Sequence, residues 1–213
     1  MSTLAPGLLV AAPPLADPNF DRSVVLLASH GDAGAFGWVL NGERLMGIDE
    51  LLQHAGLPDS VVSQAGVEKL GELSAGGAGR GGAIDSSAEG LGMVSRGGPV
   101  GTQQAWLLYR TSERFDDLGD QFEVSAGITA TPSQRVLEAV ARGRVPRSLR
   151  GVLGYAGWGP TQLDEEIRAG AWLPTDVEVS LVFDVSLEDM WTHAYRSAGT
   201  SPIAFTSRTI GQA

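Results

Sequence analysis

The stretch that decides the fold is VLGYAGWGPTQLDEEIRAG, residues 152–170. It opens with an apolar run of the kind that forms a strand covered on both faces. Trp158 follows between two glycines, and Pro160 fits the first position of a helix, where no amide donor is needed. Leu163 and Ile167 share one face of that helix, and the closing glycine ends it in a left-handed conformation. We therefore expect a core strand, a tight corner and a helix that packs on a sheet.

The corner around Trp158 has two interpretations, a ligand site and a structural joint. A strand, a glycine turn and a helix start can bind an anion through free backbone amides. Here Pro160 removes one of those amides, and the acidic residues 164–166 already complement the helix dipole. We favour the structural joint, in which Trp158 is a packing element and not a ligand platform.

The composition is that of one folded domain without a membrane segment. The chain has 213 residues, of which 43% are hydrophobic, enough for a sizeable core. No apolar run approaches the ~20 residues that span a bilayer. The first residues lack the basic region of a signal peptide and are interrupted by Pro13 and Pro14. We expect a single domain over residues 1–213, in the cytoplasm and without membrane contact.

The residue types exclude several kinds of chemistry. The chain has no cysteine, which rules out disulfides, thiolate nucleophiles and thiolate metal sites. Its 3 histidines lie far apart and show no HExxH spacing. Lys69 is the one lysine, and it does not stand in a phosphate-binding loop pattern. We therefore expect no metal and no cofactor.

The net charge argues against direct binding to nucleic acids. The chain carries 15 basic and 25 acidic residues, which gives a formal charge of −10. A nucleic-acid interface usually shows as a basic patch or stripe. The nearest candidate surrounds an expected helix end, where the helix dipole favours cations in any case. Its members are Arg135, Arg142, Arg144, Arg147 and Arg150.

The remaining hydrophobic patterns predict a mixture of strands and helices. Expected strands cover residues 7–12, 24–28, 35–40, 105–109, 122–129, 149–156 and 177–183. Expected helices cover residues 48–55, 132–142, 160–169 and 187–194, and residues 172–174 are interpreted as a turn. Because strands often follow one another directly, we predict an α+β domain. Its sheet is largely antiparallel and coiled, with about four flanking helices.

Residues 58–96 are interpreted as a glycine-rich inserted loop. Within them, Gly77, Gly79 and Gly82 have the spacing of the dinucleotide-binding fingerprint. That fingerprint requires an apolar strand before it and an apolar helix after it, and neither pattern is present. We therefore interpret the glycines as loop composition.

Several motifs together are similar to those of a known family. They are residues 17–25 with His30, the run GAFGWVLN at 34–41, GGPV at 97–100, residues 154–167, Trp172-Leu173 and the 183–191 region. The chain resembles the bacterial YqgE/AlgH family along most of its length. The resemblance implies a compact α+β fold with bifurcated, strongly coiled sheets. It implies no agreed activity, because members are often labelled as transcriptional regulators without assigned catalytic residues.

The chain departs from the family pattern in three places. Gly42-Glu43 follows Asn41, where the family usually has a basic residue and a proline. Residues 58–96 are longer than the usual connection, and the stretch after Trp191 is less typical. The first departure changes the charge beside Asn41, so it bears on any ligand expected from relatives.

The leading functional hypothesis is a regulatory or scaffold binding module without catalytic residues, acting on a small molecule or a protein. Its candidate surface joins polar residues at strand ends with glycine-rich turns, where backbone donors become available. The residues are Arg22, Ser23, Asn41, Gly98, Pro99, Tyr155, Trp158 and Gln162. For each there is a structural alternative: Arg22 pairs with Asp21 or Asp17, and Asn41 and Gln162 tie loops together.

The alternative hypothesis is a hydrolase-type enzyme that acts on a small or phosphorylated ligand. Ser23, His30 and Asp32 are the residue types of a nucleophile, a base and its orienting acid. However, no GxSxG motif surrounds Ser23. On an extended strand Ser23 and His30 would lie about 20 Å apart. The sequence therefore favours the binding module.

Overall fold

The computed structural model describes residues 3–13, 15, 17–57 and 92–204. Its strands are β1 (Gly7–Ala11), β2 (Val24–Gly31), β3 (Gly34–Val39), β4 (Arg44–Gly47), β5 (Met93–Arg96), β6 (Val100–Arg110), β7 (Phe122–Ser125), β8 (Ile128–Thr131), β9 (Arg150–Trp158) and β10 (Trp172–Thr175). Its helices are α1 (Ile48–His54), α3 (Gln134–Ala141), α4 (Gln162–Arg168), α5 (Val179–Asp184) and α6 (Leu187–Ser197), with a short 3₁₀ turn at Thr111–Glu113. The predicted α+β class with a largely antiparallel sheet is confirmed.

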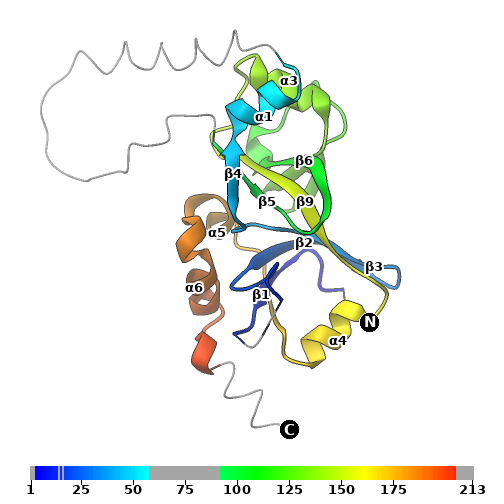
Figure 1. Ribbon diagram of the computed structural model, residues 1–213, viewed down its shortest axis with the longest axis vertical. Helices are drawn as coiled ribbons and strands as arrows, with labels where there is room; N and C mark the ends of the chain where they lie inside the picture. Colours follow the sequence, from blue (N-terminus) through cyan, green and yellow to red (C-terminus); the bar gives the residue numbers. More distant parts are fainter. Residues whose placement is uncertain (1–2, 14, 16, 58–91, 205–213) are drawn as a thin grey trace, which may run out of the picture.

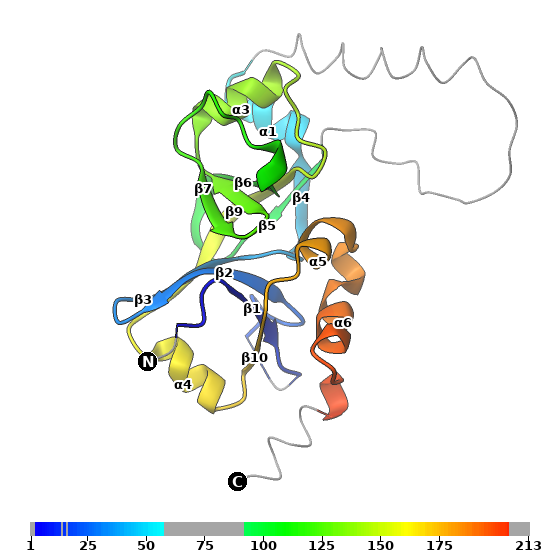
Figure 2. The same cartoon turned by 180° about the vertical axis from the view of Figure 1, so that it is seen from behind.

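The strands form one strongly coiled sheet around β9. The order along it is β10-β1-β2-β3-β9-β6-β8-β7, and β5 joins β9 in the single parallel pairing of the described strands. Figure 1 shows β9 running between two groups of elements. We call β4–β8 with α1 and α3 the upper lobe, and β1–β3 and β10 with α4 the lower lobe. Figure 2 shows the same division from behind.

The sheet divides where Gly97 lies between β3 and β9. β3 pairs directly with β9 only through residues 35–37. Further along, the Val39 amide donates to the Gly97 carbonyl at 2.8 Å, and the Gly97 amide donates to the Leu153 carbonyl at 2.7 Å. The chain after β5 therefore separates the two strands and bifurcates the sheet, as the resemblance implies.

Glycines allow the link between β5 and β6 to cross β9. The two strands pair with opposite edges of β9, so residues 97–99 pass over its backbone. Gly98 has φ +149°, and a Cβ there would overlap the Tyr155 carbonyl group. Gly154 has φ +75°, and a Cβ there would come within 2.7 Å of the Gly98 carbonyl oxygen. This close approach of two backbones explains the GGPV motif.

Three apolar clusters hold the layers together. The largest lies between the lobes and includes Trp38, Trp106 and residues of α5 and α6. The second lies under α1 and α3 in the upper lobe. The third lies within the lower lobe, between its strands and α4, and includes Trp158 and Trp172. Side chains alternate between clusters along β1 and β2, so α4 and α6 cover opposite faces of the lower lobe.

Several expected elements differ in the structure. The predicted strand at 177–183 is wrong, because α5 occupies Val179–Asp184; a short apolar run does not by itself distinguish strand from helix. The predicted turn at 172–174 is strand β10, which pairs with β1 and tolerates Pro174 at the sheet edge. Residues 122–129 extend over a hairpin of β7 and β8 rather than one strand.

The starts of the predicted helices also shift. α3 begins at Gln134, and α4 begins at Gln162 after Thr161, whose φ of 63° is left-handed. Strand β4 precedes α1, where the sequence predicted a direct link to the helix. Residues 93–96 form β5 and not a loop, and the rest of the predicted insertion, 58–91, lies outside the described residues.

Candidate functional site

A polar hollow of about 200 Å³ lies where β2 begins and where β3 and β5 end. We call it the Asn41 hollow. Its lining residues come from three segments far apart in sequence: Pro18, Asn19, Asp21, Ser23, Val39, Asn41, Gly42, Glu43, Arg96 and Gly98. Three of the predicted site residues, Ser23, Asn41 and Gly98, meet here.

Asn41 holds two of these segments together. Its Oδ1 accepts a hydrogen bond from the Val24 amide at 2.8 Å, and its Nδ2 donates to the Arg22 carbonyl at 2.9 Å. The structural alternative, in which Asn41 ties loops together, is confirmed. One N–H and one oxygen lone pair of the amide are left over, because a primary amide offers two of each.

Ser23 is the unusual group of the hollow. The residue is 3% exposed, and its hydroxyl has no hydrogen-bond partner among the described residues. Its backbone is fully engaged, since the amide donates to the Phe20 carbonyl and the carbonyl accepts from the Ala11 amide. An unpaired buried hydroxyl costs about 1–3 kcal/mol. A ligand that hydrogen-bonds to this hydroxyl would recover part of that cost.

The charged residues of the hollow are Asp21, Glu43 and Arg96. Arg96 Nη2 and Glu43 Oε2 lie 2.9 Å apart, with the two side chains 44% and 68% exposed. An ion pair so open to solvent contributes about 0–1 kcal/mol. Asp21 is exposed and has no ion pair in the described part of the chain. Sequence reasoning left these residues out of the site; the departure at Gly42-Glu43 was the one signal for them.

Arg22 connects the rim of the hollow to α6. Its backbone has a left-handed φ of 49°, and its guanidinium lies 5.4 Å from the centre of the Trp191 ring. The predicted ion pair with Asp21 or Asp17 is not formed among the described residues. Trp191 Nε1 and the Tyr195 hydroxyl both donate to the Ala11 carbonyl, at 2.8 and 3.2 Å. Burial raises the pKa of Tyr195 to about 12, so the hydroxyl stays a neutral donor.

Trp158 and Gln162 belong to a different place, in which Trp158 is buried and Gln162 is exposed. We call it the Glu166 corner, made of Phe20, Trp158, Gln162, Glu166 and Trp172. Glu166 Oε2 accepts hydrogen bonds from the indole nitrogens of Trp158 and Trp172 at 3.0 and 2.8 Å. Gln162 accepts from the Gly159 amide and donates to Glu166.

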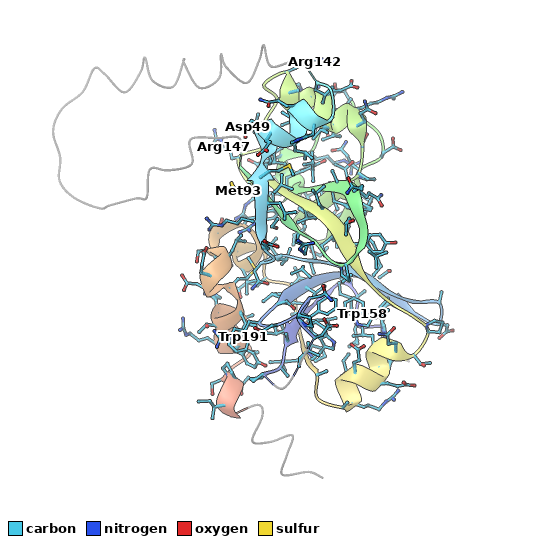
Figure 3. The ribbon with its side chains drawn as sticks, in the orientation of Figure 1. Asp49, Met93, Arg142, Arg147, Trp158 and Trp191 are labelled. Carbon is cyan, nitrogen blue, oxygen red and sulfur yellow. The ribbon has the colours of Figure 1, made fainter. Side chains whose placement is uncertain are left out.

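The corner is packed shut. Trp158 and Trp172 are 6% and 1% exposed, and the Phe20 ring contacts both indoles. Figure 3 shows Trp158 between the sheet and α4, and Trp191 on α6, across the lower lobe. The favoured interpretation of a structural joint is therefore confirmed for Trp158.

Tyr155 and Pro99 lie at the strand crossing and do not line the hollow. The Tyr155 ring packs against Phe36, with centroids 4.9 Å apart. Pro99 is exposed and directly follows Gly98 over the β9 backbone. The predicted surface thus separates into the hollow, the crossing and the Glu166 corner.

The residues proposed for a hydrolase do not come together as a triad. His30 Nδ1 accepts from the Leu4 amide at 3.3 Å, and Nε2 lies 3.4 Å from Asp164 Oδ1. His30 thereby fixes α4 to the far end of β2, whereas Ser23 stands just before its start. Asp32 is exposed in the β2–β3 turn.

The described residues were also compared with the requirements of a metal site and of a membrane-spanning helix. In the described ranges, no group of three or more His, Asp or Glu side chains has the geometry to hold a metal ion. Among the helices of the described residues, none combines the length and apolarity needed to cross a membrane.

The chain resembles known proteins over nearly its whole length. The AlgH-like family model matches residues 8–203. A UPF0301 protein of Anaeromyxobacter sp. (strain K) is 40% identical over 202 residues, covering 95% of this chain and 91% of the relative. A UPF0301 protein of Saccharophagus degradans is 31% identical over 211 residues, covering 99% and 89%.

Two solved structures are similar in fold to this chain over most of its length. The solution structure of the AlgH protein from Pseudomonas aeruginosa has a TM-score of 0.63 at 27% identity, covering 94% of this chain and 91% of that one. A crystal structure from Corynebacterium diphtheriae has the same TM-score at 21% identity, covering 91% and 86%. The second supports the fold alone.

Proposed function

This chain belongs to the AlgH-like family, and we propose that it is a non-catalytic binding module whose ligand site is the Asn41 hollow. The observation that carries the proposal is Ser23, a lining residue of that hollow whose buried hydroxyl has no hydrogen-bond partner among the described residues. Buried polar groups in folded proteins are nearly always hydrogen-bonded. Of the four unpaired buried atoms in the described residues, on Ser23, Trp38, Trp106 and Ser125, the Ser23 hydroxyl belongs to a residue that lines this hollow.

A regulatory or scaffold role is the second part of the proposal. Asn41 holds the Arg22 carbonyl, and the Arg22 guanidinium lies over Trp191 of α6. A ligand that displaces the segment around Arg22 would change the packing of α6 against β1. We propose that the protein acts in the cytoplasm, where binding of a small molecule would regulate its contact with a partner protein.

The hydrolase and the DNA-binding regulator have weaker support. His30 is engaged with Leu4 and Asp164 at the far end of β2, so it cannot serve as a base for Ser23. In the arginine cluster, Arg142 and Arg144 already pair with Glu138 and Asp117. These contacts use the charges that a phosphate backbone would need.

The test is a ligand panel read by NMR amide shifts and thermal unfolding. The panel contains amines, carboxylates, amino acids, sugars, nucleotides and inorganic phosphate. We expect at least one class to shift the Ser23, Asn41 and Gly98 amides and to raise Tm. Ser23→Ala should weaken that binding, because the unpaired hydroxyl is gone.

Ser29→Ala is the matched control, because Ser29 is an exposed residue of β2, in the same strand region. It should bind like the wild type. The proposal fails if no class shifts these amides, or if the shifts map to the hollow between α5 and α6 instead.

A further inference from the structure

The charge around the Asn41 hollow is unbalanced. One cation, Arg96, faces two carboxylates, Asp21 and Glu43, and it is already paired with Glu43 at 2.9 Å. The neighbouring Arg22 does not compensate, because its guanidinium lies over the Trp191 ring. Asp17 lies outside the lining and accepts two hydrogen bonds from Asn19. Asp21 is therefore left as an acceptor without a cation in the described structure.

Three groups of the hollow offer unengaged acceptors, beside the free second N–H of the Asn41 amide. Asp21 offers a carboxylate, Ser23 an unpaired hydroxyl, and Asn41 the second lone pair of Oδ1. An ammonium group has three donors and no acceptor, and so matches this set. An anion would meet Asp21 and Glu43 at close range and would find Arg96 already paired. The unpaired carboxylate of Asp21 and the excess of acidic groups thus favour a cation over an anion.

The hollow has room for a short aliphatic chain. Its volume of about 200 Å³ corresponds to roughly six or seven water molecules at ~30 Å³ each. A primary amine on four or five carbons fits this space. Val39 and Pro18 supply the apolar part of the lining against which the methylene groups would lie.

We infer that the Asn41 hollow binds the primary ammonium group of an aliphatic amine, with Asp21, Ser23 and Asn41 as acceptors. The inference rests on the proposed function and gives it a ligand class. Two sources share this chemistry, a free small amine and the lysine side chain of a partner. Both would place the ammonium group against the same three acceptors.

The test titrates the full-length protein with n-butylamine, 1,4-diaminobutane, a blocked lysine tripeptide, butyrate, 1-butanol and inorganic phosphate. We expect the amines or the lysine peptide to shift the Ser23, Asn41 and Gly98 amides. Butyrate, 1-butanol and phosphate should not shift them. Asp21→Asn should weaken amine binding about tenfold, since a hydrogen bond to a charged group is lost.

Asp32→Asn is the matched control, because Asp32 is also an exposed aspartate but lies in the β2–β3 turn. It should bind amines like the wild type, and thermal unfolding checks that both variants fold. Binding of the free amines identifies a small ligand, and binding of the lysine peptide alone identifies a protein partner. Both results support the inference.

The inference and the proposed function can fail separately. If butyrate or phosphate shifts the hollow amides and Ser23→Ala weakens the effect, the binding site stands and the cation inference is overturned. The cation inference is likewise overturned if amines bind to the hollow but Asp21→Asn leaves their affinity unchanged. If no compound of this set or of the wider panel shifts these amides, both are overturned.

Discussion

The Asn41 hollow and the Glu166 corner are both built from segments far apart in sequence, yet they differ in how their polar groups are satisfied. At the Glu166 corner the indole nitrogens of Trp158 and Trp172 share one carboxylate. At the Asn41 hollow the Ser23 hydroxyl is buried without a partner. A satisfied cluster holds the fold, and an unsatisfied one beside open space is suited to bind a ligand.

The comparison also shows that different motifs of the family resemblance fall on the two places. The motif with the strongest resemblance, residues 154–167, falls on the strand crossing and on the Glu166 corner. Gly154 allows two backbones to approach, and Gln162 orients Glu166. This part of the signature therefore identifies the architecture, whereas the motifs at 17–25, 34–41 and 97–100 supply residues that line the proposed site.

The largest expected effect is at the Glu166 corner. Glu166→Ala leaves two buried indole donors without an acceptor, so we expect a loss of about 4 kcal/mol in the free energy of unfolding. Urea unfolding followed by tryptophan fluorescence measures it. Glu165→Ala, on the exposed side of α4, should cost less than about 1 kcal/mol. Equal losses for the two variants would show that the corner is not held by Glu166.

The next effect tests the wall of the hollow. Gly98→Ala places a Cβ onto the Tyr155 backbone at a positive φ, so we expect a loss of about 3 kcal/mol. Gly119→Ala is the control, since a Cβ there has no neighbouring atom within 4 Å. Denaturant midpoints of the two variants give the comparison. A Gly98→Ala protein as stable as the wild type would contradict the tight crossing.

Asn41→Ala tests the two hydrogen bonds by which Asn41 holds the segments of the hollow together. It removes the acceptor of the Val24 amide and the donor to the Arg22 carbonyl, so we expect a loss of about 2 kcal/mol. Asn41→Asp keeps the acceptor and removes the donor, so it should lie between Ala and the wild type. Chemical denaturation gives the free energy of unfolding of the wild type and the two variants. If Asn41→Asp is as stable as the wild type, the hydrogen bond from Asn41 Nδ2 to the Arg22 carbonyl contributes nothing to stability.

The smallest expected effect is the sharpest test of the comparison. Ser23→Ala removes a hydroxyl without a partner, so stability should change by less than about 0.5 kcal/mol or increase. Thr131→Val is the control, because the buried Thr131 hydroxyl donates to the Asp120 carbonyl and accepts from the Ser133 amide. It should cost about 1–2 kcal/mol. A Ser23→Ala loss as large as that of Thr131→Val would show that Ser23 is already satisfied.

The sequence alone determined the features that depend on local pattern. The strands at 7–12, 24–28 and 35–40 were predictable because their apolar, β-branched runs are bounded by turn residues. The Ser186-x-x-Asp189 spacing is typical of a helix cap, and the Ser186 side chain accepts from the Asp189 amide at the start of α6. Ser23, Asn41 and Gly98 were named for the site because glycine-rich turns and strand ends expose polar groups.

Only the tertiary structure decided how these pieces are used. Residues 179–184 are helical because they fill the space between the lobes, and residues 172–175 are a strand because β1 offers an edge. Glu166 joins two tryptophans, and Arg96 meets Glu43 across 53 positions of sequence. Such contacts depend on which distant segment of the chain packs against each residue, and the local sequence pattern does not specify that segment.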